Sequence, residues 1–268
     1  MGRETYTFRL NEQALSTTLA DTLQNELRGN LSFFEYVLRE NEQLIKYGWK
    51  YINLQQYLSA GEIITTFRSD PAKANVLYLG VAMDWLWESD MIEYSSIDRF
   101  NSSFAKYGFE QIYELGQKDK CWVYLNQLYT YTDMNDLENK IDTYDGHYYL
   151  WENDVYKDGL DYLLVLLNKV CLDKDYKFSD GNYYTEKTLN FLNDYKKDRR
   201  LIEQAELALI DIRAENEEAD LKEEANPNYR RSYTNNHYGV AETMFSQIKE
   251  VQKSIKEYSG KIFILDSQ

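Results

Sequence analysis

Only two prolines, Pro71 and Pro227, occur in the 268 residues of this chain. Proline has no backbone N–H and its ring clashes with the preceding helical turn, so it ends most helices that contain it. It normally makes up about 5% of residues. A chain with so few breakers can form long helices without interruption. We therefore predict a mainly α, bundle-like single chain, with at most a small β element from the two termini and two Asp-Gly turns.

The N-terminal half has helical periodicity. Leucines at positions 15, 19, 23 and 27 repeat every four residues, and Gly29-Asn30 looks like a stop. A second helix is predicted from about Leu31. Its apolar side is predicted to contain Phe34, Val37, Leu38, Ile45 and Trp49.

Asp70-Pro71 predicts a turn and a new helix start, with Asp70 as N-cap and Pro71 in the first helical position. Residues 75–87 are apolar on nearly every side, which indicates a central, buried helix. Asp84 lies within it, and a buried carboxylate needs a partner. Residues 97–131 are predicted to form two further helices, divided at 116–119.

Short strand signals lie at both ends of the chain. Residues 5–10 alternate polar and apolar side chains, and residues 261–265 form an apolar run after Gly260. Asp145-Gly146 and Asp180-Gly181, each flanked by aromatic residues, predict hairpins or turns. Residues 160–172 between them are predicted to form a buried helix or strand.

Two amphipathic helices are predicted near the C-terminus. The first runs from about residue 185 to Leu221 and ends before Asn226-Pro227-Asn228. The second follows over residues 241–258, and the two are expected to form a hairpin. One apolar stripe of this second helix is predicted to contain Ala241, Met244, Phe245, Ile248, Val251, Ile255 and Tyr258. This pattern divides the chain into an N-terminal helical region 1–131, a turn-rich connection 132–186 and a C-terminal helical region 187–268, in one or two compact domains.

The charge of the chain limits its partners. Its formal net charge is −15, which argues against broad binding to nucleic acid or an anionic membrane, because both need a basic face. Nine acidic residues fall in residues 201–224 against two basic ones. This acidic segment is either a solvated helix face or a surface that meets a basic partner. Its carboxylates are Glu203, Glu206, Asp211, Glu215, Glu217, Glu218, Asp220, Glu223 and Glu224.

Residues for metal or cofactor chemistry are few. The chain has two cysteines without metal-ligand spacing and two histidines, fewer than a zinc hydrolase needs. Both Asp-Gly tracts fail the spacing of a calcium loop, and no phosphate-binding glycine loop or nucleophile turn occurs. No metal and no cofactor are expected. No apolar run reaches membrane-spanning length and no secretory signal begins the chain, so a cytoplasmic protein is expected.

One short motif could carry catalysis. Arg230 or Arg231, separated from His237 by six or five intervening residues, resembles the signature of HEPN-domain ribonucleases, which are helical bundles common in bacterial toxin and phage-defence systems. The resemblance covers about ten residues and implies metal-independent RNA cleavage. Histidine would act on the 2′-hydroxyl or the leaving oxygen, and arginine would stabilise charge on the phosphate.

The leading prediction is a non-enzymatic, acidic protein that inhibits or neutralises another protein. Such proteins serve in microbial conflict, as phage counter-defence or toxin-immunity factors. The acidic segment and 25 tyrosines supply interface material, and the partner would have a basic surface, such as a nucleic-acid-binding or defence protein. A HEPN-like ribonuclease using Arg231 and His237, and a structural subunit of a homo-oligomeric assembly, are the alternatives.

Overall fold

The computed structural model describes the residues in ranges 4–25, 31–47, 57–92, 103–114, 140–142, 146–172, 217–229 and 245–267, with positions 200 and 214. The chain divides into two compact units that are discontinuous in sequence. The first comprises residues 1–114, 134–153 and 257–268, and the second comprises residues 115–133 and 154–256. A C-terminal strand therefore belongs to the same unit as the N-terminal helices.

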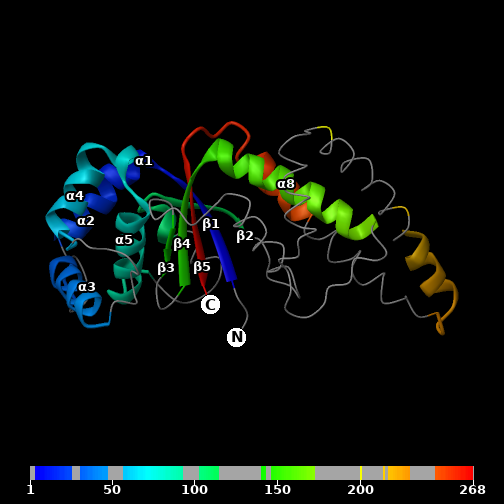
Figure 1. Ribbon diagram of the computed structural model, residues 1–268, viewed down its shortest axis with the longest axis horizontal. Coiled ribbons are helices and arrows are strands. Elements are labelled where there is room, and N and C mark those ends of the chain that lie inside the picture. Colours follow the sequence, from blue (N-terminus) through cyan, green and yellow to red (C-terminus); the bar gives the residue numbers. More distant parts are fainter. Residues whose placement is uncertain are drawn as a thin grey trace. The chain divides into compact units, whose positions relative to one another are not determined.

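The first unit is organised by a five-stranded antiparallel sheet in the order β2-β1-β5-β4-β3 (Figure 1). Strand β1 (Glu4–Leu10) pairs with β5 (Lys261–Ser267), with Phe8 opposite Phe263. The two terminal strands that the sequence predicts are thus confirmed, and they are neighbours in the middle of the sheet. The described residues are mainly helical, as predicted, and with this antiparallel sheet they form a mixed α/β fold rather than a purely helical bundle.

A hairpin completes one side of the sheet. Strands β3 (Lys140–Asp142) and β4 (Gly146–Glu152) pair with each other. Gly146 of the first predicted Asp-Gly turn begins β4, whereas Asp145 lies outside the described residues. The second, Asp180-Gly181, lies outside the described residues.

Strand β2 (Phe109–Glu114) corrects the helical prediction for this part of residues 97–131. A helical turn at 103–105 stops at Gly108, whose φ of +100° is a conformation that favours glycine. The chain then pairs with β1 from Leu10 opposite Phe109. Phe109 enters a ring cluster with Phe8, Phe104 and Phe263 at centroid separations of 5.6–6.3 Å. Tertiary pairing and burial outweigh the local helical pattern here.

The leucine periodicity near the N-terminus is confirmed over the described part. Helix α1 (Glu12–Ala14), the π-helical turn η1 (Leu15–Leu19) and helix α2 (Ala20–Asn25) follow one another directly. Leu15, Leu19 and Leu23 are fully buried. Leu27 and the predicted stop at Gly29-Asn30 lie outside the described residues.

Helix α3 (Phe33–Tyr47) forms as predicted but buries a different side. Phe33, Tyr36 and Val37 face the core, whereas Phe34 and Leu38 are exposed. The Phe33 ring meets Trp85 edge-on at 5.5 Å. The Asn41 side chain is also buried. Its amide donates a hydrogen bond to the Leu58 carbonyl and its oxygen accepts one from the Leu58 N–H, each at 2.8 Å. These contacts fix the rotation of the helix. The Ile45 side chain and Trp49 lie outside the part of the chain that the structure describes.

Helix α4 (Ala60–Ser69) ends at the predicted turn, but the next long helix begins later than predicted. Pro71 starts only the short 3-10 turn η2 (Pro71–Lys73), and Asp70 makes no side-chain capping bond. Helix α5 (Val76–Glu88) is capped instead by Asn75, whose side chain accepts from the Tyr78 N–H at 2.9 Å. Helix α5 is central and largely buried, as its apolar sequence predicts.

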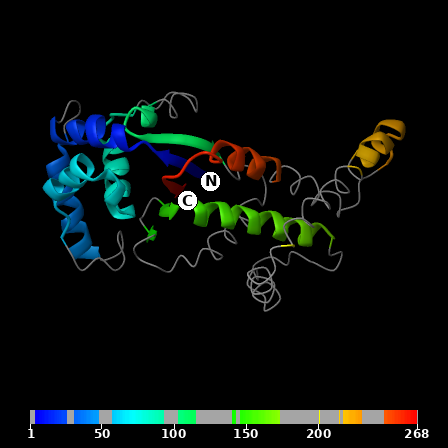
Figure 2. The ribbon, with the colours of Figure 1, turned by 90° about the horizontal axis from the view of Figure 1, so that it is seen from above.

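The described part of the second unit is helical. Helix α8 (Asn153–Leu172) starts directly after β4, at the boundary between the two units, which settles residues 160–172 as helix. A helix over residues 245–254 lies beside it (Figure 2). The Gln252 amide donates to Asp161 at 2.6 Å, and the Lys157 ammonium donates to the carbonyl of Lys256 at 3.3 Å. Phe245, Ile248, Val251 and Ile255 of the predicted apolar stripe are buried.

Candidate functional site

The acidic segment is described in its C-terminal part, where residues 217–225 form a helix of the second unit. Glu217, Glu218, Asp220, Glu223 and Glu224 are all exposed on this helix. Glu203, Glu206, Asp211 and Glu215 lie outside the described residues. The structure thus places five of the nine predicted carboxylates together on one exposed helix.

This helix also presents an apolar side chain to solvent. Leu221 is 65% exposed, whereas Ala219 is only 4% exposed. Helix positions that are two residues apart in sequence lie about 200° apart around the helix axis. Leu221 therefore lies on the side opposite the buried Ala219. Glu217, Glu218 and Glu224 are three or four residues from Leu221 and are its neighbours on that outward side. We name Glu217, Glu218, Asp220, Leu221, Glu223 and Glu224 the acidic helix surface.

One carboxylate of the acidic helix surface forms an ion pair within the same helix, between Glu218 and Lys222 at 2.7 Å. The hydrogen bond from Lys222, and then its positive charge, lower the pKa of the Glu218 carboxyl below its usual value. The helix ends after Ala225 as predicted, because Asn226 forms a turn in which its carbonyl accepts from the Tyr229 N–H at 2.8 Å. Proline at 227 then prevents continuation of the helix.

The ribonuclease-like residues cannot be placed, because Arg230, Arg231 and His237 all lie outside the described residues. The other histidine, His147, is on β4, with its ring 6.3 Å from that of Tyr149. Among the described residues, no group of three or more His, Cys, Asp or Glu side chains is arranged to hold a metal ion.

The Asp84 carboxylate has the partner that its apolar surroundings require. The hydroxyl of Tyr148 on β4 donates a hydrogen bond to Asp84 Oδ1. Tyr148 itself stacks on Phe263 with a centroid separation of 5.6 Å. Gly80 permits this approach, because a Cβ atom there would lie 3.2 Å from the Tyr148 ring. The pair therefore joins α5 to the sheet and has the character of a structural contact.

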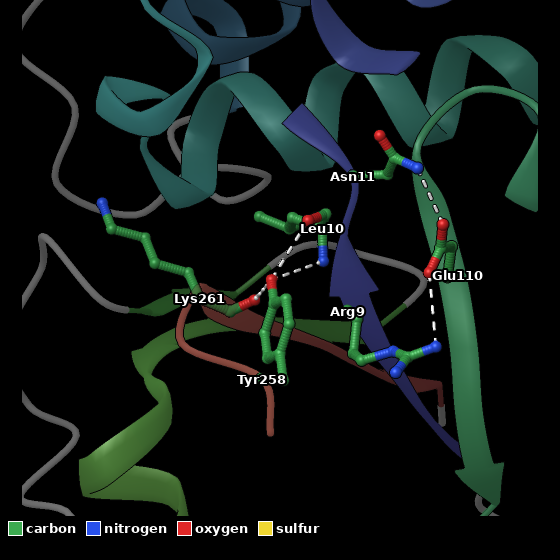
Figure 3. A network of polar contacts seen from close by, with 6 residues as sticks. All are labelled: Arg9, Leu10, Asn11, Glu110, Tyr258 and Lys261. Carbon is green, nitrogen blue, oxygen red and sulfur yellow. Dashed lines mark hydrogen bonds and ion pairs between the residues drawn. The ribbon is translucent and has the colours of Figure 1, made fainter. Parts of the chain in front are cut away.

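A second polar cluster lies where β1 ends and β5 begins (Figure 3). The Tyr258 hydroxyl accepts from the Leu10 N–H at 3.0 Å. It also lies 2.8 Å from the carbonyl oxygen of Lys261 and 3.1 Å from that of Leu10, and it can donate its proton to either. On the other side of β1, the Glu110 carboxylate accepts from Asn11 at 2.8 Å and from Arg9 at 3.4 Å.

Sequence reasoning placed Tyr258 on the apolar stripe of the last helix, but the helix ends at residue 254. The hydroxyl sits one step beyond the last paired residues of the two strands, Arg9 and Ile262, and takes the place of ladder hydrogen bonds. Partial burial raises the pKa of Tyr258 above its ordinary value, so the phenol is neutral at physiological pH. The cluster supports the fold rather than proton transfer.

Replacing Tyr258 by phenylalanine is expected to lower the free energy of unfolding by about 1–3 kcal/mol, because a buried backbone donor loses its acceptor.

A group whose pKa is raised on folding stabilises the fold fully below its unfolded pKa. The contribution is lost as pH rises through the folded pKa. The difference between wild type and Tyr258→Phe should therefore be constant at neutral pH and shrink above about pH 10. Urea unfolding at several pH values measures this. A difference that stays constant to the alkaline limit would contradict the assignment.

The described residues contain no helix that is long and apolar enough to span a membrane. No known protein family, no curated protein and no solved structure matches the chain. A functional conclusion therefore has to come from the surfaces themselves.

Proposed function

We propose that the chain is a non-enzymatic inhibitor or neutraliser that binds a basic surface of another protein and occludes that protein's site. A role in microbial conflict, as a phage counter-defence or toxin-immunity factor, is part of the proposal. The acidic helix surface carries it. Carboxylates that stand on an exposed helix can occupy the positions that phosphates take in a nucleic-acid-binding partner.

Leu221 adds an apolar centre to the acidic helix surface. The carboxylates around it, rather than the leucine alone, support the proposal, because a single exposed apolar residue does not mark an interface. Here a 65%-exposed leucine is bordered by Glu217, Glu218 and Glu224. An apolar centre with a charged rim is the common anatomy of a protein interface, in which the rim steers association and the centre supplies affinity.

The proposal is tested by affinity capture from the native host with the full chain as bait. We expect a captured partner with a basic surface, released by raising the salt concentration, since screening weakens exposed charge pairs. The variants Arg231→Ala and His237→Ala should capture it equally well. An RNA-cleaving activity of the wild type that disappears in His237→Ala would instead support the ribonuclease alternative.

A further inference from the structure

The outward side of α3 has two large apolar side chains that the core leaves unused. Phe34 is 44% exposed and Leu38 is 65% exposed. They are four residues apart and so are neighbours on one side of the helix. Phe33, Tyr36 and Val37 already supply the buried side. Helix α3 is therefore apolar on two sides, although a surface helix needs only one apolar stripe to pack on its own core.

Tyr57 adds a third apolar group to the same region. It is 73% exposed and directly precedes Leu58. The backbone N–H and carbonyl of Leu58 are both hydrogen-bonded to the Asn41 side chain. Asn41 lies three residues after Leu38 on α3. Three of the five large apolar side chains exposed in the described residues thus come from α3 or from the segment bonded to it, and the other two are Val155 and Leu221. Grouping of this kind marks interaction sites, whereas single exposed apolar residues do not.

Among the described residues of α3, the exposed charges beside Phe34 and Leu38 are mainly negative. Glu35 and Glu42 are exposed and lie on the same outward side as Leu38. The nearby cation of Arg39 is already engaged by Glu88, which accepts a hydrogen bond from it, and by Glu40 at 3.5 Å. Lys46 is exposed as well, but it lies two helical turns beyond Leu38.

We propose that Phe34, Leu38 and Tyr57, bordered by Glu35 and Glu42, are a docking site for a partner segment whose apolar side chains are flanked by lysine or arginine. A second copy of this chain fits less well, because it would bring the same carboxylates and a net charge of −15. The site extends the proposed function by adding a contact on the first unit. It shares no residue with the acidic helix surface, so either surface can fail without the other.

The test uses a fluorescent synthetic peptide of leucine and lysine that forms an amphipathic helix, with a leucine–glutamate peptide as its counterpart. Fluorescence anisotropy at physiological ionic strength measures binding to the full chain. We expect saturable binding of the leucine–lysine peptide alone. The double variant Phe34→Ser/Leu38→Ser should weaken it roughly tenfold or more, because burial of these side chains is lost.

Val155→Ser is the matched control, since Val155 and Phe34 are both 44% exposed and Val155 belongs to neither proposed surface. It should leave peptide binding unchanged. The double variant Glu35→Gln/Glu42→Gln, which keeps the apolar groups, should weaken binding and reduce its salt dependence. It tests the site even if the serine variant folds poorly.

Four results would overturn the proposal. The first is an absence of saturable binding to the wild type, and the second is equal binding by the wild type and both double variants. The third is self-association in light scattering that Leu38→Ser abolishes, which would make a second copy the occupant. Binding that falls in Leu221→Ser but not in the α3 variants would support the acidic helix surface as the binding site and reject α3.

Discussion

Replacing Phe263 by alanine is expected to lower the free energy of unfolding of the first unit by about 3–5 kcal/mol, the usual cost of deleting a buried aromatic side chain. Phe263 is fully buried on β5. Its ring lies between those of Phe8, Phe109 and Tyr148, at centroid separations of 5.6–6.3 Å. The substitution removes contacts to three other strands of the sheet at once.

Urea unfolding followed by tryptophan fluorescence measures this effect. Leu38→Ala is the control, because Leu38 is 65% exposed and such a surface change should stay within about 0.5 kcal/mol. Equal stability of wild type and Phe263→Ala would show that β5 is not held between β1 and β4.

Replacing Gly108 by alanine is expected to have the second-largest effect on stability, a loss of about 2–4 kcal/mol from backbone strain and overpacking together. Gly108 has a φ of +100°, and a Cβ atom there would lie 2.9 Å from Leu15 and 3.0 Å from the Asn11 carbonyl oxygen. The Gly108 carbonyl also accepts from the Asn11 N–H at 2.9 Å. This turn therefore fixes how the chain enters β2.

Gly61→Ala is the matched control for this substitution. Gly61 lies in α4, and its added Cβ would meet only Ser59 Oγ at 3.9 Å. Alanine favours a helix over glycine by up to about 1 kcal/mol, so this variant should unfold at the same or a higher urea concentration. If Gly108→Ala behaves like Gly61→Ala, the positive φ at Gly108 is wrong.

The sequence predicted the elements whose signal is local. The buried leucines at 15, 19 and 23, the apolar helix α5 and the two terminal strands all follow from short-range spacing or composition. The Asp145-Gly146 dipeptide predicted a hairpin for the same reason, since this turn chemistry depends on two adjacent residues, and β3 pairs with β4.

What it missed depends on distant contacts. Residues 109–114 have no clean alternation and become a strand because they pair with β1. Either Phe33 or Phe34 could face the core, so the sequence is compatible with two rotations of α3 about its axis. The hydrogen bonds between Asn41 and Leu58 select the rotation that buries Phe33. The need for a partner at Asp84 was predictable, but its identity was not, since Tyr148 is 64 residues away. Tyr258 and Leu10 are separated by 248 residues.

The candidate site divides in the same way. An exposed acidic helix follows from composition, and five of its carboxylates are exposed as a binding surface requires. The solvent-facing position of Leu221, by contrast, depends on which side of its helix is buried. The exposed apolar side of α3 was predicted as core, because periodicity gives an amphipathic stripe but not the side that other elements cover.

The most direct test of the proposed function is the affinity of the captured partner for two variants of equal net charge. One neutralises Glu217, Asp220, Glu223 and Glu224 by amide substitution and spares Glu218, which pairs with Lys222. The control neutralises four exposed carboxylates elsewhere in the same manner: Glu12, Asp154, Glu250 and Glu257. Calorimetric titration at low and high salt compares both variants with the wild type.

We predict that the first variant binds on the order of tenfold more weakly at low salt, and with less salt dependence, because several interfacial charge pairs are lost. The control should bind as tightly as the wild type. Equal affinity of the two variants, or an affinity that salt does not change in the wild type, would contradict the acidic helix surface as the partner-binding site.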